Sequence, residues 1–133
     1  MNSGKSEQRT YKNYEMSNML SILEGHIESA TGKFGYAIAR NVRKLKDACL
    51  EFLQVRQELF TKYGTEEFDS NGNPTGNISI KIGTPECDEY LKQLGEYADI
   101  EHSVEIYKIP YSILPEELTA KDLLELDWML YDE

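Results

Sequence analysis

The sequence predicts an α+β fold that is mostly helical, with one long central helix at about residues 36–63. Apolar residues in this segment recur at alternating spacings of four and three, the period of a helix with one buried face: Ile38, Val42, Leu45, Cys49 and Phe52. Alternating apolar and polar residues at 78–82 and 104–109 predict two short strands. A chain of 133 residues is long enough to bury a core as one domain.

The length of the central helix has a consequence for its packing. At 1.5 Å per residue it would be about 40 Å long, whereas a chain of this size has a radius of gyration of about 14 Å. We therefore expect the helix to pair with a preceding helix at 14–29 as a helical hairpin, and with its counterpart in a second copy as a homo-oligomer, most simply a homodimer. Gly64 is placed to end the helix.

The segments around this helix complete the domain organisation. The polar residues 1–12 are expected to form a mobile tail, and residues 13–133 a single domain. A loop rich in Asp, Asn and Gly is expected at 65–77. The strands at 78–82 and 104–109 are then expected to pair as a small two-stranded antiparallel sheet.

Two further helices are predicted from signals at their N-termini. Thr84 followed by Pro85 is typical of an N-cap and a first helical position, so a helix is expected to start there. Thr119 with Asp122 approximates a capping box, in which each side chain bonds the other's backbone N–H. A last helix is therefore expected over residues 120–131.

Charge is distributed unevenly along the chain, whose net charge is −10. Residues 1–46 carry eight basic and four acidic side chains, a net +4, and the remainder carries six basic and twenty acidic side chains, a net −14. Such polarity predicts ion pairing between the two parts, within or between subunits, or a basic patch that meets an anionic ligand. Extended nucleic acid is disfavoured as a partner, because the acidic remainder would repel a polyanion.

The basic charges concentrate at the start of the central helix. Five lie within residues 33–46, where there is no acid, and several recur on one side of the helix at spacings of three and four. Backbone N–H groups of a first helical turn suit an anion, arginine can clamp a phosphate, and an aromatic ring can stack on a base. The candidate site for an anion or nucleotide comprises Lys33, Phe34, Tyr36, Arg40, Arg43 and Lys44.

Two other interpretations of the charges stay open. The basic residues can simply pair with the acidic remainder of the chain. The acidic remainder can serve solubility alone, or can engage a basic host protein.

The residue inventory disfavours catalysis. The two histidines, His26 and His102, are isolated and lack the spacing of a metal-binding pair, and no motif supplies a nucleophile with its base or a phosphate-binding glycine loop. We therefore expect a protein that is not an enzyme, with no metal and no cofactor. Cys49 and Cys87 are expected to be reduced and buried.

One loop resembles a calcium site and fails the test. Asp69, Asn71 and Asn73 stand at the first, third and fifth positions of such a loop, but Pro74 replaces the required glycine and Ile80 the required acid. A tight polar turn is the better interpretation.

The run Tyr36–Leu45 (YAIARNVRKL), the helix end Lys62-Tyr63-Gly64 and the closing residues 118–130 (LTAKDLLELDWML) carry a family resemblance. Over about residues 33–133 the chain resembles a family of uncharacterised small proteins of tailed phages and prophages of Gram-positive bacteria. The resemblance implies a phage origin and action in the cytoplasm of the infected bacterial host. The resemblance assigns no role to individual residues. Separately, no apolar run in the sequence approaches the length of a membrane span.

These observations lead to two functional hypotheses. In the first, a non-enzymatic accessory protein neutralises a component of host defence, either a nucleotide-like signal bound at the basic helix or a defence protein bound at the acidic surface. In the second, the protein is a morphogenesis factor or a minor structural component of the phage particle.

Overall fold

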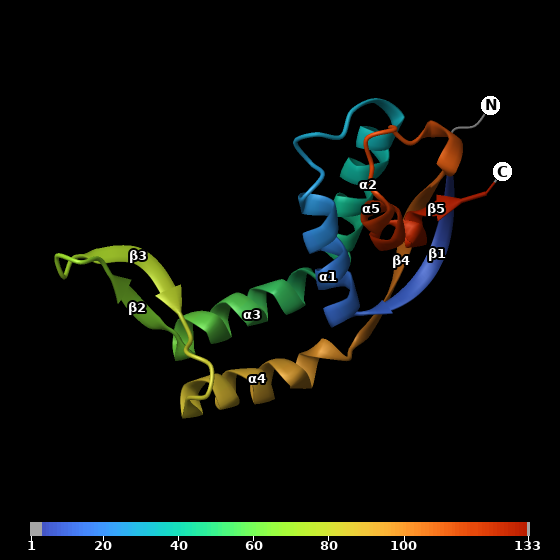
Figure 1. Cartoon of the computed structure of the whole chain (residues 1–133). Helices are drawn as coiled ribbons and strands as arrows, with labels where there is room; N and C mark the ends of the chain where they lie inside the picture. The colour runs from blue at the N-terminus through green and yellow to red at the C-terminus, as the bar shows by residue number, and fades with distance from the viewer. Residues whose placement is uncertain (1–3, 133) are drawn as a thin grey trace. The chain divides into compact units, whose positions relative to one another are not determined.

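The computed structural model describes residues 4–132, which form two compact units (Figure 1). The first unit contains the chain up to Cys49 and from Glu101 onward, and the second unit is the continuous segment Leu50–Ile100. The predicted α+β class is confirmed. Among the described residues, no helix is long and apolar enough to span a membrane.

The first unit is built on a three-stranded sheet in the order β1-β4-β5. Strand β1 (Lys5–Lys12) runs antiparallel to β4 (Glu101–Pro110), and β5 (Leu130–Tyr131) runs parallel to the end of β4, with Ile109 opposite Leu130. Val104 and Ile106 alternate along β4 as buried residues. This period of two places one face of the sheet in the core.

Two helices form a hairpin beside this sheet. α1 (Asn13–Glu24) and α2 (Gly32–Ala48) pack against each other and run in opposite directions (Figure 1). α2 also packs along β4. The short elements that follow β4 are η1 (Tyr111–Ile113), α5 (Ala120–Glu125) and η2 (Asp127–Met129). The core of the unit includes Met16, Leu23, Ile38, Leu45, Ile106, Leu126 and Met129, each essentially inaccessible to solvent.

A buried asparagine links α2 to the edge of β4. Asn41 is fully buried; its Nδ2 donates to the carbonyl oxygen of Tyr107 at 2.9 Å, and its Oδ1 accepts from the Tyr107 N–H at 2.8 Å. The β5 pairing covers β4 only at Ile109 and Pro110, so Asn41 supplies at Tyr107 the two hydrogen bonds that a neighbouring strand would make. A buried backbone pair without such partners would cost free energy of folding.

The second unit combines two helices with a β-hairpin. α3 (Leu50–Tyr63) packs on α4 (Pro85–Ala98), with Phe52, Leu59 and Cys87 buried. Thr84 caps α4 as predicted, because its Oγ1 accepts from the Cys87 N–H at 3.2 Å.

The hairpin pairs β2 (Thr65–Phe68) with β3 (Pro74–Ser79). Its tip is the predicted polar turn, since Asp69 Oδ1 accepts from the N–H groups of Asn71 and Asn73 at 2.9 and 3.0 Å.

The predicted central helix over 36–63 is two helices in the structure. Cys49, with φ −109° and ψ 19°, leaves the helical conformation between α2 and α3. The apolar period is continuous through this residue, but the residues before it bury their side chains in one unit and those after it in the other. The spacing of apolar residues indicates which positions are buried, but it does not indicate whether they are buried in one core or in two. That residues 13–133 form a single domain stays a prediction.

The predicted strand pairing was wrong. β3 pairs with β2 rather than with β4, and the partner of β4 is β1, in the segment expected to be a mobile tail. Most side chains of Lys5–Lys12 are polar and exposed, so the segment lacks the apolar alternation that marks a strand. Residues 1–3 of the predicted tail lie outside the described residues.

Two predicted helices are shorter than expected. The first ends at Glu24, where Gly25 follows as the C-cap. The last ends at Glu125 and gives way to η2 and β5, although its capping box is present: Thr119 N–H donates to Asp122 Oδ2 at 3.0 Å, and Asp122 N–H donates to Thr119 Oγ1 at 3.2 Å.

Candidate functional site at the start of α2

The first turn of α2 leaves backbone donors without partners in the helix. Its N-cap, Thr31, makes no capping bond with its side chain, and Gly32 has φ +61°, a conformation that glycine adopts readily. The first helical hydrogen bond runs from Gly35 N–H to the Thr31 carbonyl oxygen at 2.9 Å. The N–H groups of residues 32–34 therefore have no carbonyl partner within the helix.

A pocket of about 460 Å³ opens beside this turn. One wall is the end of the α1–α2 loop with the first residues of α2, and the other is the chain from Ile113 to Leu118. The lining combines apolar and polar side chains: Ser29, Thr31, Gly32, Lys33, Phe34, Ile113, Pro115, Glu117 and Leu118. The volume lies in the range of about 300–1,000 Å³ that is common for small-molecule sites.

A smaller pocket of about 170 Å³ adjoins the first. It is lined by Gly4, Gly32, Lys33, Tyr36, Tyr107, Ile109 and Ile113. The two pockets share Gly32, Lys33 and Ile113, so Lys33 stands where they meet. Tyr36 is half exposed and meets the ring of Tyr107 edge-on, with ring centroids 5.5 Å apart.

Arg40 holds the two tyrosines of the smaller pocket in place. Its Nη1 donates to the Tyr36 hydroxyl at 3.2 Å, its Nη2 donates to Glu105 Oε1 at 3.0 Å, and its guanidinium carbon lies 4.9 Å from the centre of the Tyr107 ring. The bond to Tyr36, followed by the bond to Glu105, raises the pKa of Arg40 above its usual value. Arg40 is thereby fixed as a positioning residue for Tyr36.

The predicted site residues differ in whether they border the pockets and in whether their side chains are exposed. Lys33 and Tyr36 border the pockets, with Lys33 exposed. Phe34 also lines the larger pocket, but its side chain is buried and packs edge-on against His26, so it belongs to the wall and offers little ring surface for stacking.

The remaining predicted residues lie further along α2. Lys44 Nζ lies 4.0 Å from the same Glu105 carboxylate that Arg40 uses, so one acid serves two cations. This pairing matches the internal ion-pair interpretation. Arg43 is exposed, and within residues 4–132 it makes no ion pair. Sequence reasoning missed Tyr107, Ile113, Glu117 and Leu118.

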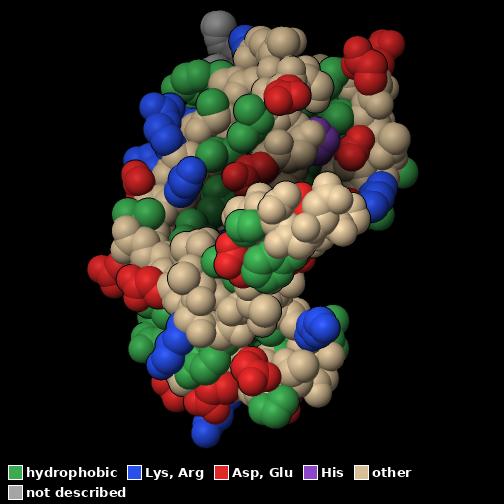
Figure 2. Space-filling model, turned by 90° about the vertical axis from the view of Figure 1, so that its left-hand side faces the viewer, with side chains coloured by type: hydrophobic (Ala, Val, Ile, Leu, Met, Phe, Trp, Pro, Cys, Tyr) green, Lys and Arg blue, Asp and Glu red, His purple; other side chains and the backbone are tan. Residues whose placement is uncertain are grey.

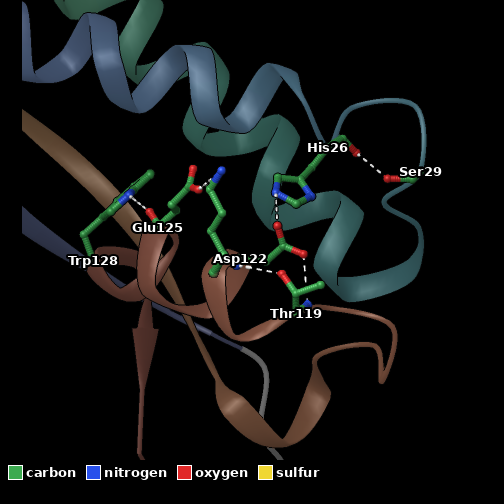
Figure 3. A network of polar contacts seen from close by, with 7 residues as sticks. His26, Ser29, Thr119, Asp122, Glu125 and Trp128 are labelled. Atoms are coloured by element: carbon green, nitrogen blue, oxygen red, sulfur yellow. Dashed lines mark hydrogen bonds and ion pairs between the residues drawn. The ribbon is translucent and has the colours of Figure 1, made fainter.

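A polar network joins the α1–α2 loop to the start of α5 (Figure 3). His26, in the α1–α2 loop, places Nε2 3.9 Å from Asp122 Oδ1, and the other oxygen of Asp122 accepts from the Thr119 N–H. The Thr119 backbone bond is the main cause that lowers the pKa of Asp122, with smaller contributions from His26 and Lys121. The network ties the loop that leads to Thr31 to the start of α5, just after Leu118.

The larger pocket is lined by residues of both charges, Lys33 and Glu117. Figure 2 shows that acidic and basic side chains are also interspersed over one face of the molecule. Within residues 4–132, no group of three or more His, Cys, Asp and Glu side chains could hold a metal ion. A mixed surface suits a small ligand in a pocket better than a long polyanion.

The fold and the site define a small α+β protein with an open two-part pocket, an exposed lysine at its centre and aromatic and apolar walls. Comparisons with protein-family models, with curated proteins and with solved structures find no match.

Proposed function

We propose that this chain is a non-enzymatic binding protein that captures a small, nucleotide-like anion at the start of α2. The observation that carries the proposal is the position of Lys33, which borders two adjoining pockets beside a helical turn whose N–H groups have no partner in the helix. Lys33 and these N–H groups would hold a phosphate. The half-exposed Tyr36 ring would supply a surface for a base.

The biological role that we propose follows from the resemblance to phage and prophage proteins. An accessory protein in the cytoplasm of an infected bacterium can neutralise a defence signal simply by lowering its free concentration. Such sequestration requires no chemical step, and it requires only a dissociation constant below the concentration of the signal and enough copies of the protein. A binding pocket without catalytic machinery is sufficient for it.

Calorimetric titration with AMP, cyclic nucleotides and inorganic phosphate tests the proposal. We expect the wild-type chain to bind at least one of these nucleotides, and Lys33→Ala to weaken that binding about tenfold through loss of a charge-assisted contact. Lys46→Ala is the matched control, because Lys46 is also an exposed lysine of α2 but lies away from both pockets. The absence of both binding heat and thermal stabilisation with every nucleotide would refute the proposal.

A second candidate function is binding of a basic protein through the second unit. This unit carries ten acidic and four basic side chains. It also exposes large apolar side chains, among them Phe68, Ile82 and Leu91. A unit that combines an excess of acids with exposed apolar side chains is suited to a basic amphipathic partner.

Titration with a basic amphipathic peptide tests this candidate. This candidate would be supported if Leu91→Asp and added salt both weaken binding and Lys33→Ala leaves it unchanged. Binding that is insensitive to Leu91→Asp would exclude this surface.

A further inference from the structure

We infer that the two adjoining pockets at the start of α2 form one site for a dinucleotide, with its linking phosphate at Lys33 and one base in each pocket. The inference rests on the proposed function, because it uses the same site and names the class of ligand more narrowly. It is carried by three features of the lining: the residues that the pockets share, the different chemistry of the two pockets, and the charge that they present.

The shared residues place one cation between two cavities. Gly32, Lys33 and Ile113 border both pockets, so a group bound at Lys33 has access to each of them. The smaller pocket, at about 170 Å³, lies below the common range for a complete small-molecule site, whereas the larger pocket, at about 460 Å³, lies within it. The smaller cavity therefore suits one ring system of a ligand whose remaining part occupies the larger one.

The two pockets offer different chemistry. The larger pocket contains the hydroxyls of Ser29 and Thr31 and the carboxylate of Glu117, together with apolar side chains. Glu117 can accept a hydrogen bond from the exocyclic amino group of a base, and hydroxyls suit a ribose. The smaller pocket is lined by two tyrosines and two isoleucines, and Lys33 is the one charged residue that the described part of the chain adds to its lining. It can therefore hold a flat ring by stacking and burial.

The charge of the lining favours a phosphodiester over a polyphosphate. Among residues 4–132, Lys33 is the only basic residue that borders either pocket, and Glu117 brings a negative charge to the larger one. Arg40 is already engaged by Tyr36 and Glu105. One lysine balances the single negative charge of a phosphate that links two nucleosides, whereas the several charges of a nucleoside triphosphate would face too few cations and one carboxylate.

Calorimetry with ApA, CpC, AMP and CMP tests the inference on the full chain. We expect the better of the two dinucleotides to bind at least tenfold more tightly than its own mononucleotide, because stacking of a second base is typically worth about 5- to 150-fold in affinity. Tyr36→Ala should remove most of this gain, because it should weaken dinucleotide binding by a larger factor than mononucleotide binding. A mononucleotide can place its one base in the larger pocket instead. Tyr14→Ala is the matched control, since Tyr14 is an exposed tyrosine of the same unit outside both pockets.

A second variant separates the ring of Tyr36 from its hydroxyl, which accepts from Arg40. Tyr36→Phe keeps the stacking surface and should retain most of the gain, and the melting temperature of each variant checks that the fold survives. The inference is overturned if neither dinucleotide binds more than twofold more tightly than its mononucleotide. It is also overturned if Tyr36→Ala weakens the binding of dinucleotides and mononucleotides equally. In either case, mononucleotide binding that depends on Lys33 would still support the proposed function. No binding of any of the four compounds would overturn the inference, and the same result with the cyclic nucleotides would overturn the proposed function as well.

Discussion

The two units of the chain differ in how completely they bury their apolar side chains. Of the eighteen buried hydrophobic residues found in the described part of the chain, fifteen lie in the first unit and three in the second. The second unit nevertheless has seven of the twelve exposed large hydrophobic residues. The candidate ligand site lies wholly in the first unit. The comparison teaches that the candidate pocket and the more exposed apolar side chains are provided by different parts of one chain.

The largest expected effect comes from opening the core of the first unit. Ile106 is fully buried in β4, so Ile106→Ala should lower the free energy of unfolding by about 4 kcal/mol through lost burial and a cavity. Ile82→Ala makes the same change in the second unit at a side chain that is 95% exposed, and it should cost less than about 0.5 kcal/mol. Urea denaturation of both variants measures the difference. Equal effects would contradict the contrast between the units.

The next effect concerns the buried amide that bonds the edge of β4. Asn41→Ala leaves the N–H and C=O groups of Tyr107 without their partner, and we expect a loss of about 2–3 kcal/mol in unfolding free energy. Asn77→Ala, at an exposed asparagine of β3, is the control and should change stability by less than about 0.5 kcal/mol. A near-neutral Asn41→Ala would show that water or another group satisfies Tyr107.

Loss of a helix cap should have a smaller effect, and it should show whether the two units unfold locally and independently of each other. Thr84→Ala and Thr119→Ala each remove a helix cap, at a cost of about 1 kcal/mol. Because α4 belongs to the unit with few buried side chains, Thr84→Ala should speed amide hydrogen exchange throughout α4 and α3, while amides of β4 stay protected. The reverse pattern, with β4 exchanging faster in Thr84→Ala, would mean that the two units open together.

The smallest effect depends on pH. The pKa of Asp122 is lowered below its ordinary value of 3.8, chiefly by the Thr119 backbone bond, so its ionised form stabilises the folded state above that ordinary value and this contribution is lost as the pH falls through the lowered pKa. Asp122→Asn should therefore be less stable than wild type at neutral pH, and the difference should shrink on acidification. Melting temperatures between pH 7 and pH 2, with Glu67→Gln as an exposed control, measure it. A difference that stays constant with pH would exclude this linkage.

Local features of the fold could be predicted from the sequence, and long-range pairings could not. The caps at Thr84 and Thr119 and the turn at Asp69 involve residues two to four positions apart, so the sequence contains all the partners. The pairing of β1 with β4 joins segments about a hundred residues apart, and the polar pattern of β1 gave no sign of it. The division at Cys49 was hidden because the apolar period runs through it.

The candidate site could also be predicted only in part, because its residues on one helix are visible in the sequence and those from distant segments are not. Lys33 and Tyr36 were identified from charge and aromatic character at a helix start, and the structure places both at the pockets. Tyr107 and Ile113 come from β4 and the segment after it, and only folding brings them to α2. The sequence does contain a signal for that segment, because Pro110 and Pro115 are typical of an irregular connector.

The order of the units along the chain has a consequence for how such a protein can diverge. The polypeptide leaves the first unit after Cys49 and returns to it at Glu101. Leu50–Ile100 is therefore inserted into the first unit, and both of its ends connect to that unit. Insertions of this kind can change in length and sequence without interrupting the segments on either side. A lineage could therefore exchange Leu50–Ile100 and keep the candidate pocket of the first unit intact.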